Sequence, residues 1–303
     1  MTTIAERQNA PVALRAAKAF RRRYRVAKFW HTLRGGGGIL LGTVGVFIAL
    51  IKPSTADGIA AAAAGWAFVG RLLLVELERH FQGDGALGQE VFDTYVLQVG
   101  WNAAAAGDPP VAEDLINWGA RQTEDGLRDW YPDTSEAIPP LDALICQRAS
   151  LTWARQDHQT YALILRVVAI AAFCVTLILG AALKLSVGDY MLRLAVPMLP
   201  GVLDILDLAR ANSELGTRRK QAEQLALAMY SNARDTAVAP TVAECRSLQD
   251  EIYRSRRVIG PPSWFYFLKR SARQINMEQV ADEQVTALPA TLKKDQTSAL
   301  VRR

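Results

Sequence analysis

Two uncharged runs decide the fold: residues 35–51 read GGGGILLGTVGVFIALI, and residues 58–75 read GIAAAAAGWAFVGRLLLV. The first run has no charged residue, and the second is interrupted only by Arg71. Runs of 17 and 18 residues lie at the short end of what an α-helix needs to cross about 30 Å of hydrocarbon. Because only Lys52–Asp57 separates them, they predict a transmembrane hairpin over 35–78 whose ends return to one side.

A second pair of apolar segments predicts another hairpin over residues 162–209. Residues 167–183 carry no charge, and a short polar turn, Lys184–Asp189, follows them. The next segment, 190–206, is interrupted by charges and prolines, namely Arg193, Pro197, Pro200 and Asp204. It is therefore expected to be a broken or kinked helix, or one that its neighbours shield from lipid.

Charge is distributed unevenly along the 303 residues, which carry a net charge of +5 and a mean hydropathy of +0.05. Residues 1–34 hold nine Lys/Arg and one acid, residues 79–160 hold thirteen acids, and residues 210–303 hold sixteen Lys/Arg. The predicted hairpin turns hold only Lys52 and Lys184 as cations. By the positive-inside rule, both termini and the middle region are predicted to be cytoplasmic.

These patterns predict an all-α membrane protein with four transmembrane helices in two hairpins. A cytoplasmic helical domain is expected from the middle region, 79–161, and the C-terminal helices, 210–286. The aromatic segment at 260–268 is expected at the membrane interface or packed on the middle region. Residues 287–303 are predicted to form a disordered tail.

The basic N-terminal segment, 1–34, contains an amphipathic pattern, with apolar residues at helical spacing: Leu14, Ala17, Phe20, Tyr24 and Ala27. Two interpretations are open. The helix lies on the membrane surface, attracted to anionic lipid, or it is a solvated helix packed on the rest of the protein.

The sequence assigns no catalytic residue, metal site or cofactor. Cys146, Cys174 and Cys245 are far apart and show no paired spacing. No Walker loop, nucleophile elbow or glycine-rich dinucleotide fingerprint is present. The isolated histidines have no metal-binding spacing; they are His31, His80 and His158. An enzyme is therefore not expected.

Several short strings carry a family resemblance through their order along the chain. They are VFDTYVL at 91–97 with Trp101-Asn102, DWYP at 129–132, ICQR at 145–148 and PSWFY at 262–266. Together with the two hairpins, they resemble the SMODS-associating four-transmembrane effector family of bacterial cyclic-oligonucleotide (CBASS) anti-phage defence. The resemblance covers roughly residues 20–280.

The resemblance implies an effector in the bacterial inner membrane that senses a cyclic di- or trinucleotide and permeabilises the bilayer. A pore for ions needs more than four thin helices, so a homo-oligomer is expected, with a tetramer as one candidate. Direct DNA or RNA binding is not expected. The alternative is a small ion channel, transporter subunit or membrane scaffold without a nucleotide ligand.

A cyclic nucleotide would need aromatic faces for its bases and guanidinium groups for its phosphates. The middle region offers such residues, although each tryptophan has a core position as its alternative role. The C-terminal arginines Arg254, Arg256 and Arg257 could complete the site. The candidate ligand-binding residues are Trp101, Arg121, Arg128, Trp130, Tyr131, Gln147 and Arg148.

Charges in or beside the apolar segments are candidates for a pore lining or a gate, because a charge at bilayer depth costs about 3 kcal/mol. The candidates are Arg71, Arg193 and Asp204, with Asp207 nearby. Arg71 or Arg193 is predicted to pair with Asp204. The alternative is that these side chains snorkel to the headgroups.

Overall fold

The computed structural model describes residues 2–260 and 270–294, and no β-strand occurs in these two stretches. The predicted all-α fold is confirmed. Two π-helical turns interrupt the α-helices, at η2 (Gly70–Leu74) and η3 (Met191–Ala195). The other elements are α1 (Ile4–Gln8), α2 (Pro11–Ile51), η1 (Pro53–Thr55), α3 (Ala56–Val69), α4 (Val75–Leu97), α5 (Ala103–Ala106), α6 (Ala112–Gly119), α7 (Leu141–Ala182), α8 (Val187–Tyr190), α9 (Val196–Thr236), α10 (Val242–Arg256), α12 (Arg270–Thr286) and η4 (Ala290–Leu292).

The chain divides into two compact units, each built from separated stretches of sequence. Unit 1 comprises Met1–Tyr24, Gln82–Asp157 and Leu215–Arg303, whereas unit 2 comprises Arg25–Phe81 and His158–Glu214. The helices α2, α4, α7 and α9 each contribute one part to both units. The unit boundaries therefore fall inside helices, and the break predicted after residue 34 is absent because α2 continues through it.

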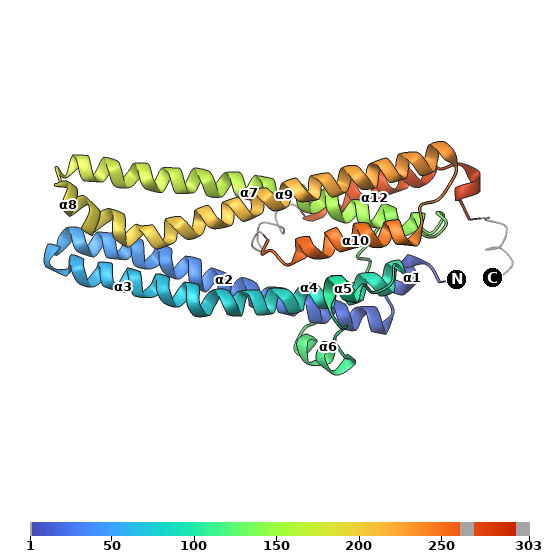
Figure 1. The fold of residues 1–303 in the computed structure, drawn as a ribbon, viewed down its shortest axis with the longest axis horizontal. Coiled ribbons are helices and arrows are strands. Elements are labelled where there is room, and N and C mark those ends of the chain that lie inside the picture. The colour runs from blue at the N-terminus through green and yellow to red at the C-terminus, as the bar shows by residue number, and fades with distance from the viewer. Residues whose placement is uncertain (1, 261–269, 295–303) are drawn as a thin grey trace. The chain divides into compact units, whose positions relative to one another are not determined.

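Unit 2 contains the apolar segments of both predicted hairpins. Among the described residues, three helical stretches are long and apolar enough to cross a membrane: Pro11–Ile51, Pro53–Leu97 and Leu141–Ala182. The predicted fourth segment, 190–206, is not among them; it contains η3 and then Pro200 within α9. Figure 1 shows the α2–α3 turn and the α7–α8 turn at the same end of this unit.

Close glycine contacts pack the helices of unit 2 within one chain. A Cβ at Gly37 of α2 would lie 2.2 Å from the indole of Trp66 on α3, so no larger residue fits there without a shift. A Cβ at Gly38 would lie 3.6 Å from the backbone of Gly201 on α9. Small residues thus let α2 approach two neighbours closely, and the run Gly35–Gly38 continues α2 instead of starting a helix.

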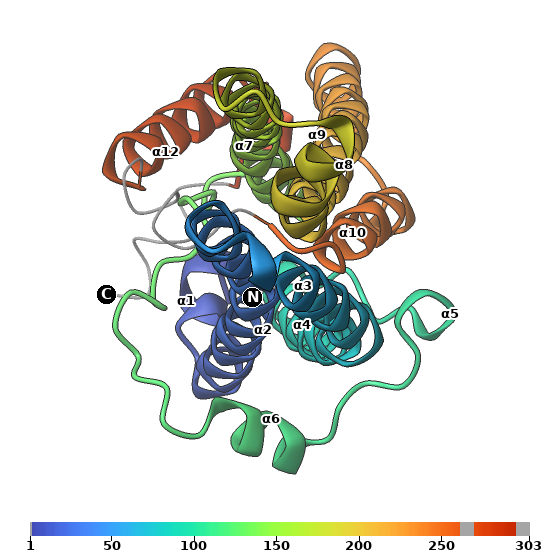
Figure 2. The ribbon, with the colours of Figure 1, turned by 90° about the vertical axis from the view of Figure 1, so that its left-hand side faces the viewer.

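The core of unit 1 buries the apolar face of the N-terminal helix. Leu14, Ala17 and Phe20 are almost inaccessible to solvent and belong to the same cluster as Phe92 of α4 and Leu144 of α7. Because protein covers this face, the packed-helix interpretation is favoured over a helix lying on the membrane. Figure 2 shows α6 on the outer side of α2.

The prediction of a disordered tail from residue 287 is wrong for its first part. Leu288 and Leu292 are buried in the core of unit 1, and Lys293 forms an isolated bridge with Ala137. Two apolar anchors therefore hold 287–294 on the protein. The remainder of the predicted tail, 295–303, and the aromatic residues 261–268 lie outside the described residues.

Candidate functional site: a basic pocket in unit 1

A pocket of about 580 Å³ opens in unit 1 between the start of α2, the end of α6 and the loop that follows α6. Helix α6 approaches α2 closely because its last residue is a glycine: a Cβ at Gly119 would lie 3.0 Å from the Lys18 side chain. The lining residues are Asn9, Pro11, Leu14, Arg15, Lys18, Leu115, Ile116, Gly119, Ala120, Arg121, Gln122, Glu124 and Arg128.

The lining combines apolar residues with an excess of positive charge: it holds four cations and one carboxylate, Glu124. Lys18 Nζ lies 2.8 Å from Glu124 Oε1, and Arg128 Nη2 lies 3.2 Å from Glu124 Oε2. The side chains of Arg15 and Arg121 form no ion pair or hydrogen bond with any described residue. Guanidinium groups in this state are ready to bind phosphate oxygens in pairs.

The loop on one side of the pocket is tied to the N-terminal helices by reciprocal hydrogen bonds. The Tyr131 backbone N–H donates to Gln8 Oε1 over 2.7 Å, and Gln8 Nε2 donates back to the Tyr131 carbonyl over 3.4 Å. Asn9 and Asp129 form a second reciprocal pair. The loop is therefore tied to the N-terminal helices at Asp129 and Tyr131. Its pocket-lining residues are Arg121, Gln122, Glu124 and Arg128.

Backbone strain occurs at two positions of this loop, which runs from residue 120 to residue 140. Arg121 has φ +68° and Asp129 has φ +52°, in the left-handed region that costs side chains other than glycine about 1 kcal/mol or more. Strain of this kind is concentrated at ligand sites and switch segments. At Arg121 it presents a cation at the pocket wall.

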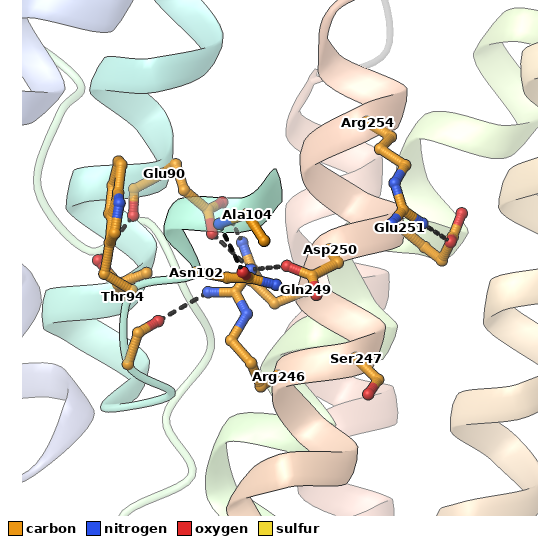
Figure 3. Close-up of polar contacts among 12 residues, drawn as sticks. Glu90, Thr94, Asn102, Ala104, Arg246, Ser247, Gln249, Asp250, Glu251 and Arg254 are labelled. Atoms are coloured by element: carbon orange, nitrogen blue, oxygen red, sulfur yellow. Dashed lines mark hydrogen bonds and ion pairs between the residues drawn. The ribbon is translucent and has the colours of Figure 1, made fainter. Parts of the chain in front are cut away.

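A second cluster of charges is buried between α4 and α10 (Figure 3). Arg246 Nη2 donates to Glu90 Oε1 over 2.6 Å and to Asp250 Oδ1 over 2.7 Å, and Arg246 Nη1 donates to the Gly100 carbonyl. Asn102 Nδ2 donates to Asp250 Oδ2 over 2.7 Å. These bonds join α4, the loop after it and α10.

Asp93, which is fully buried on α4, is the centre of this buried network. Its Oδ1 accepts from the Tyr131 hydroxyl over 2.7 Å, and its Oδ2 accepts from Gln249 Nε2 over 2.8 Å and lies 2.5 Å from Arg256 Nη1. Tyr131 therefore joins the end of the pocket loop to the buried network. Asp93 thus joins α4 to α10 through Gln249 and Arg256.

Burial and charge shift the pKa values in the network. Burial raises the pKa of the Glu90 carboxyl, and neighbouring Asp93 raises it further. Burial lowers the pKa of the Arg256 guanidinium, but Asp93 and the other groups around it reverse this effect, so the net shift is upward. The network thus places the charged Arg256 beside two carboxylates, Asp93 and Glu90, and burial makes Glu90 harder to ionise.

Two of the predicted ligand-binding residues, Arg121 and Arg128, line the pocket, and the other five do not. Trp130 packs edge-on against Phe20 and Phe92 in the core. Tyr131 and Gln147 are buried in the network, where Gln147 Nε2 donates to Gln249 and the Cys245 carbonyl. Trp101 Nε1 donates to the Gly107 carbonyl, and Arg148 lies on α7 beside Glu223.

The sequence interpretation missed Arg15, Lys18 and Glu124 as pocket residues. Arg15 and Lys18 are three residues apart on one helical face, but their distance in sequence from the α6 loop hides the pairing. Of the C-terminal arginines, Arg256 is buried in the network, and Arg254 pairs with Glu251.

The charges of unit 2 are paired differently from the prediction. Asp204 pairs with Arg34, whose Nη1 donates to it over 2.6 Å, because α2 extends Arg34 alongside α9. Arg34 also lies 3.4 Å from Glu78, and His31 lies 3.2 Å from the same carboxylate. Arg71 instead contacts Asp207, and Arg193 contacts Asp189. One guanidinium thus links α2, α4 and α9.

No group of three or more His, Cys, Asp or Glu side chains that could hold a metal ion occurs among residues 2–260 and 270–294. The three cysteines are free thiols, and burial raises the pKa of Cys146 and Cys245, which keeps these two thiols protonated at neutral pH. The pocket is a candidate for binding an anion because its lining holds four cations and one carboxylate.

Comparison with known proteins agrees with this architecture. The SMODS-associating 4TM effector domain matches residues 2–284, nearly the whole chain. A probable CBASS effector molecule of Bacillus cereus (strain VD146) is 23% identical over 287 residues, covering 91% of this chain and 96% of the relative. No solved structure matches. Since the match runs through both units, the chain belongs to the SMODS-associating 4TM effector domain family.

Proposed function

We propose that this chain is an anti-phage defence effector whose basic pocket in unit 1 receives a cyclic oligonucleotide. The observation that carries the proposal is the pocket itself, whose lining holds the unpaired Arg15 and Arg121 together with apolar Leu115 and Ile116. Guanidinium groups suit phosphodiesters, and the apolar wall suits the bases. The ligand class is a cyclic di- or trinucleotide, as the resemblance implies.

The response is permeabilisation of the bacterial inner membrane by unit 2, with both termini and unit 1 on the cytoplasmic side. Large apolar side chains of unit 2 face outward, among them Phe47, Phe68 and Ile178. They suit contact with lipid or with further copies of the chain, and a homo-oligomer supplies the helices that one chain lacks for a pore. Because α2, α4, α7 and α9 enter both units, movement of one unit has a covalent route to the other.

Vesicle leakage tests the proposal. The full chain is reconstituted into dye-loaded vesicles and treated with a panel of cyclic di- and trinucleotides. At least one member is expected to release the dye, and the double variant Arg15→Ala/Arg121→Ala is expected to abolish release. The matched control is Arg218→Ala/Lys220→Ala, which removes two exposed cations of α9 that do not line the pocket. Release without any ligand would instead favour a constitutive channel.

The ionic link between Arg34 and Asp204 is proposed as the element that keeps unit 2 closed. Both side chains are mostly buried, with exposed fractions of 13% and 16%. Removing one partner therefore leaves the other charge uncompensated in a largely buried position. Asp204→Asn is expected to change leakage more than the amount of protein in the membrane. A change in protein amount alone would contradict this role, and Asp207→Asn, in the exposed pair with Arg71, is the control.

A further inference from the structure

Glu124 occupies the centre of the positive charge in the pocket. Its two carboxylate oxygens are divided between two cations: Oε1 faces Lys18 Nζ at 2.8 Å, and Oε2 faces Arg128 Nη2 at 3.2 Å. These three side chains all line the pocket, and Glu124 is the one carboxylate in its lining. A phosphate in this position would likewise be an anion that accepts hydrogen bonds from Lys18 and Arg128 through two of its oxygens.

We propose that Glu124 is an internal competitor for the phosphate position, which it holds in the resting protein and leaves when a phosphate of the ligand binds. This inference rests on the proposed function, because it assigns the pocket to a phosphate-bearing ligand. Lys18 and Arg128 then exchange one anion for another. Arg15 and Arg121, which have no such partner in the described chain, bind a second phosphate.

The contacts of Glu124 are of the kind that can be exchanged. The exposed fractions of the side chains are 44% for Glu124, 32% for Lys18 and 56% for Arg128. Ion pairs this exposed are weak and screened by salt, so a ligand can replace one partner at small cost. The pKa of Glu124 lies below its usual value because of the hydrogen bond from Lys18 and the charge of Lys18, so the competitor is ionised at neutral pH.

The arrangement predicts selection by the number of phosphates. A ligand with one phosphate either binds the unpaired Arg15 and Arg121 or replaces Glu124, so it engages only one of the two pairs of cations. A ligand with two phosphates replaces Glu124 and also engages the unpaired arginines. Since a competitor reduces the fraction of protein ready to bind, it lowers the apparent affinity by that fraction. Glu124 would thus keep abundant monophosphates from occupying both phosphate positions at once.

The test uses inorganic pyrophosphate as the probe and calorimetry on the detergent-solubilised full chain at low salt. Glu124→Gln keeps the size of the side chain and removes its charge. It is expected to bind pyrophosphate about two- to fivefold more tightly than the wild type, the fold-change that corresponds to a surface ion pair. The matched control, Glu113→Gln, neutralises an exposed carboxylate of α6 outside the pocket lining and is expected to bind as the wild type does.

A second variant locates the effect. In a Glu124→Gln background, Lys18→Ala/Arg128→Ala is expected to lose the gain in affinity. Unchanged or weaker binding by Glu124→Gln, or an equal gain in Glu113→Gln, would overturn the competitor. Neither result would touch the proposed function, which fails instead if no cyclic nucleotide causes leakage. Tighter pyrophosphate binding with no response to any cyclic nucleotide would support the competitor and reject the proposed ligand.

Discussion

The buried network around Asp93 and the pocket around Glu124 are both built from arginines and carboxylates, yet they differ in burial. Asp93 is fully buried and has three polar partners, whereas Glu124 is 44% exposed and has two. In the network, a lost partner strands a charge in a medium of low dielectric. In the pocket, water or a ligand replaces it. Similar residues therefore hold helices together in one place and remain exchangeable in the other.

The difference teaches which charges to associate with function. A buried residue that donates its hydrogen bonds inside the protein is not available to a ligand. This applies to Tyr131, which donates to Asp93, and to Gln147, which donates to Gln249 and the Cys245 carbonyl. A ligand site needs accessible charges that are unpaired or in weak, exposed pairs, and Arg15 and Arg121 are exposed and unpaired among the described residues. The variants below separate the two kinds of charge by asking whether stability or binding changes.

The largest effect is expected from Asp93→Asn. It leaves the Arg256 guanidinium, which is 6% exposed, with Glu90 at 4.0 Å as its remaining carboxylate. The free energy of unfolding should fall by about 3 kcal/mol, as for other buried pairs that lose one partner. The change is measured by thermal unfolding in detergent. Asp235→Asn, in an exposed pair with Arg234, should leave stability almost unchanged. A loss equal to that of Asp93→Asn would show that burial does not separate the two pairs.

A smaller loss is expected from Tyr131→Phe, which deletes one buried donor to Asp93. A hydrogen bond to a charged group contributes about 1.5–3 kcal/mol, and the low end applies because Asp93 keeps Gln249 and Arg256. If Tyr131 also couples the pocket loop to the network, leakage in response to ligand should weaken while pyrophosphate affinity stays the same. A parallel fall in affinity would show that the loop is only misplaced.

The transmembrane segments could be predicted from sequence because long uncharged runs are a local signal. The continuity of α2 could not, since the basic stretch before Arg34 and the four glycines after it look like a boundary. The helix continues because Gly37 fits against Trp66, and Gly38 lies against Gly201. These contacts override the low helix propensity of glycine, and no local pattern reveals them.

The site was predictable only in part. Arg121 and Arg128 are conspicuous in an acidic region, but Arg15 and Lys18 join them through tertiary packing. The aromatic candidates failed for a physical reason, because Trp130 completes a core with Phe20 and Phe92. A single sequence does not separate a tryptophan that packs from one that binds. The tail was misjudged because Leu288 and Leu292 are two apolar residues separated by Pro289 in a short polar stretch, which is too little to show as a buried segment.

The pH dependence of stability tests the buried network without a change in its shape. Because the pKa of Glu90 is raised above its ordinary value of 4.5 by burial, the folded protein binds this proton more tightly than the unfolded chain. Stability contributed by Glu90 should therefore be highest below pH 4.5 and fall as the pH rises through the folded pKa, by at most about 1.4 kcal/mol per pH unit. The unfolding free energy of the wild type minus that of Glu90→Gln isolates this contribution and should fall as the pH rises. A value that rises with pH would contradict the prediction.

The smallest effect on stability, but one of opposite sign, is expected at the pocket wall. Arg121→Gly should raise the free energy of unfolding by about 0.5–1 kcal/mol, because glycine adopts φ +68° without strain and loses more backbone entropy in return. The same change removes a pocket cation, so pyrophosphate binding should weaken about tenfold. Ala237→Gly, at φ +57° outside the pocket lining, should gain stability and leave binding unchanged. If Arg121→Gly gains stability and loses binding while Ala237→Gly only gains stability, the strain at Arg121 is kept for the ligand. Asp93→Asn and Tyr131→Phe in the buried network are expected to do the opposite and lose stability.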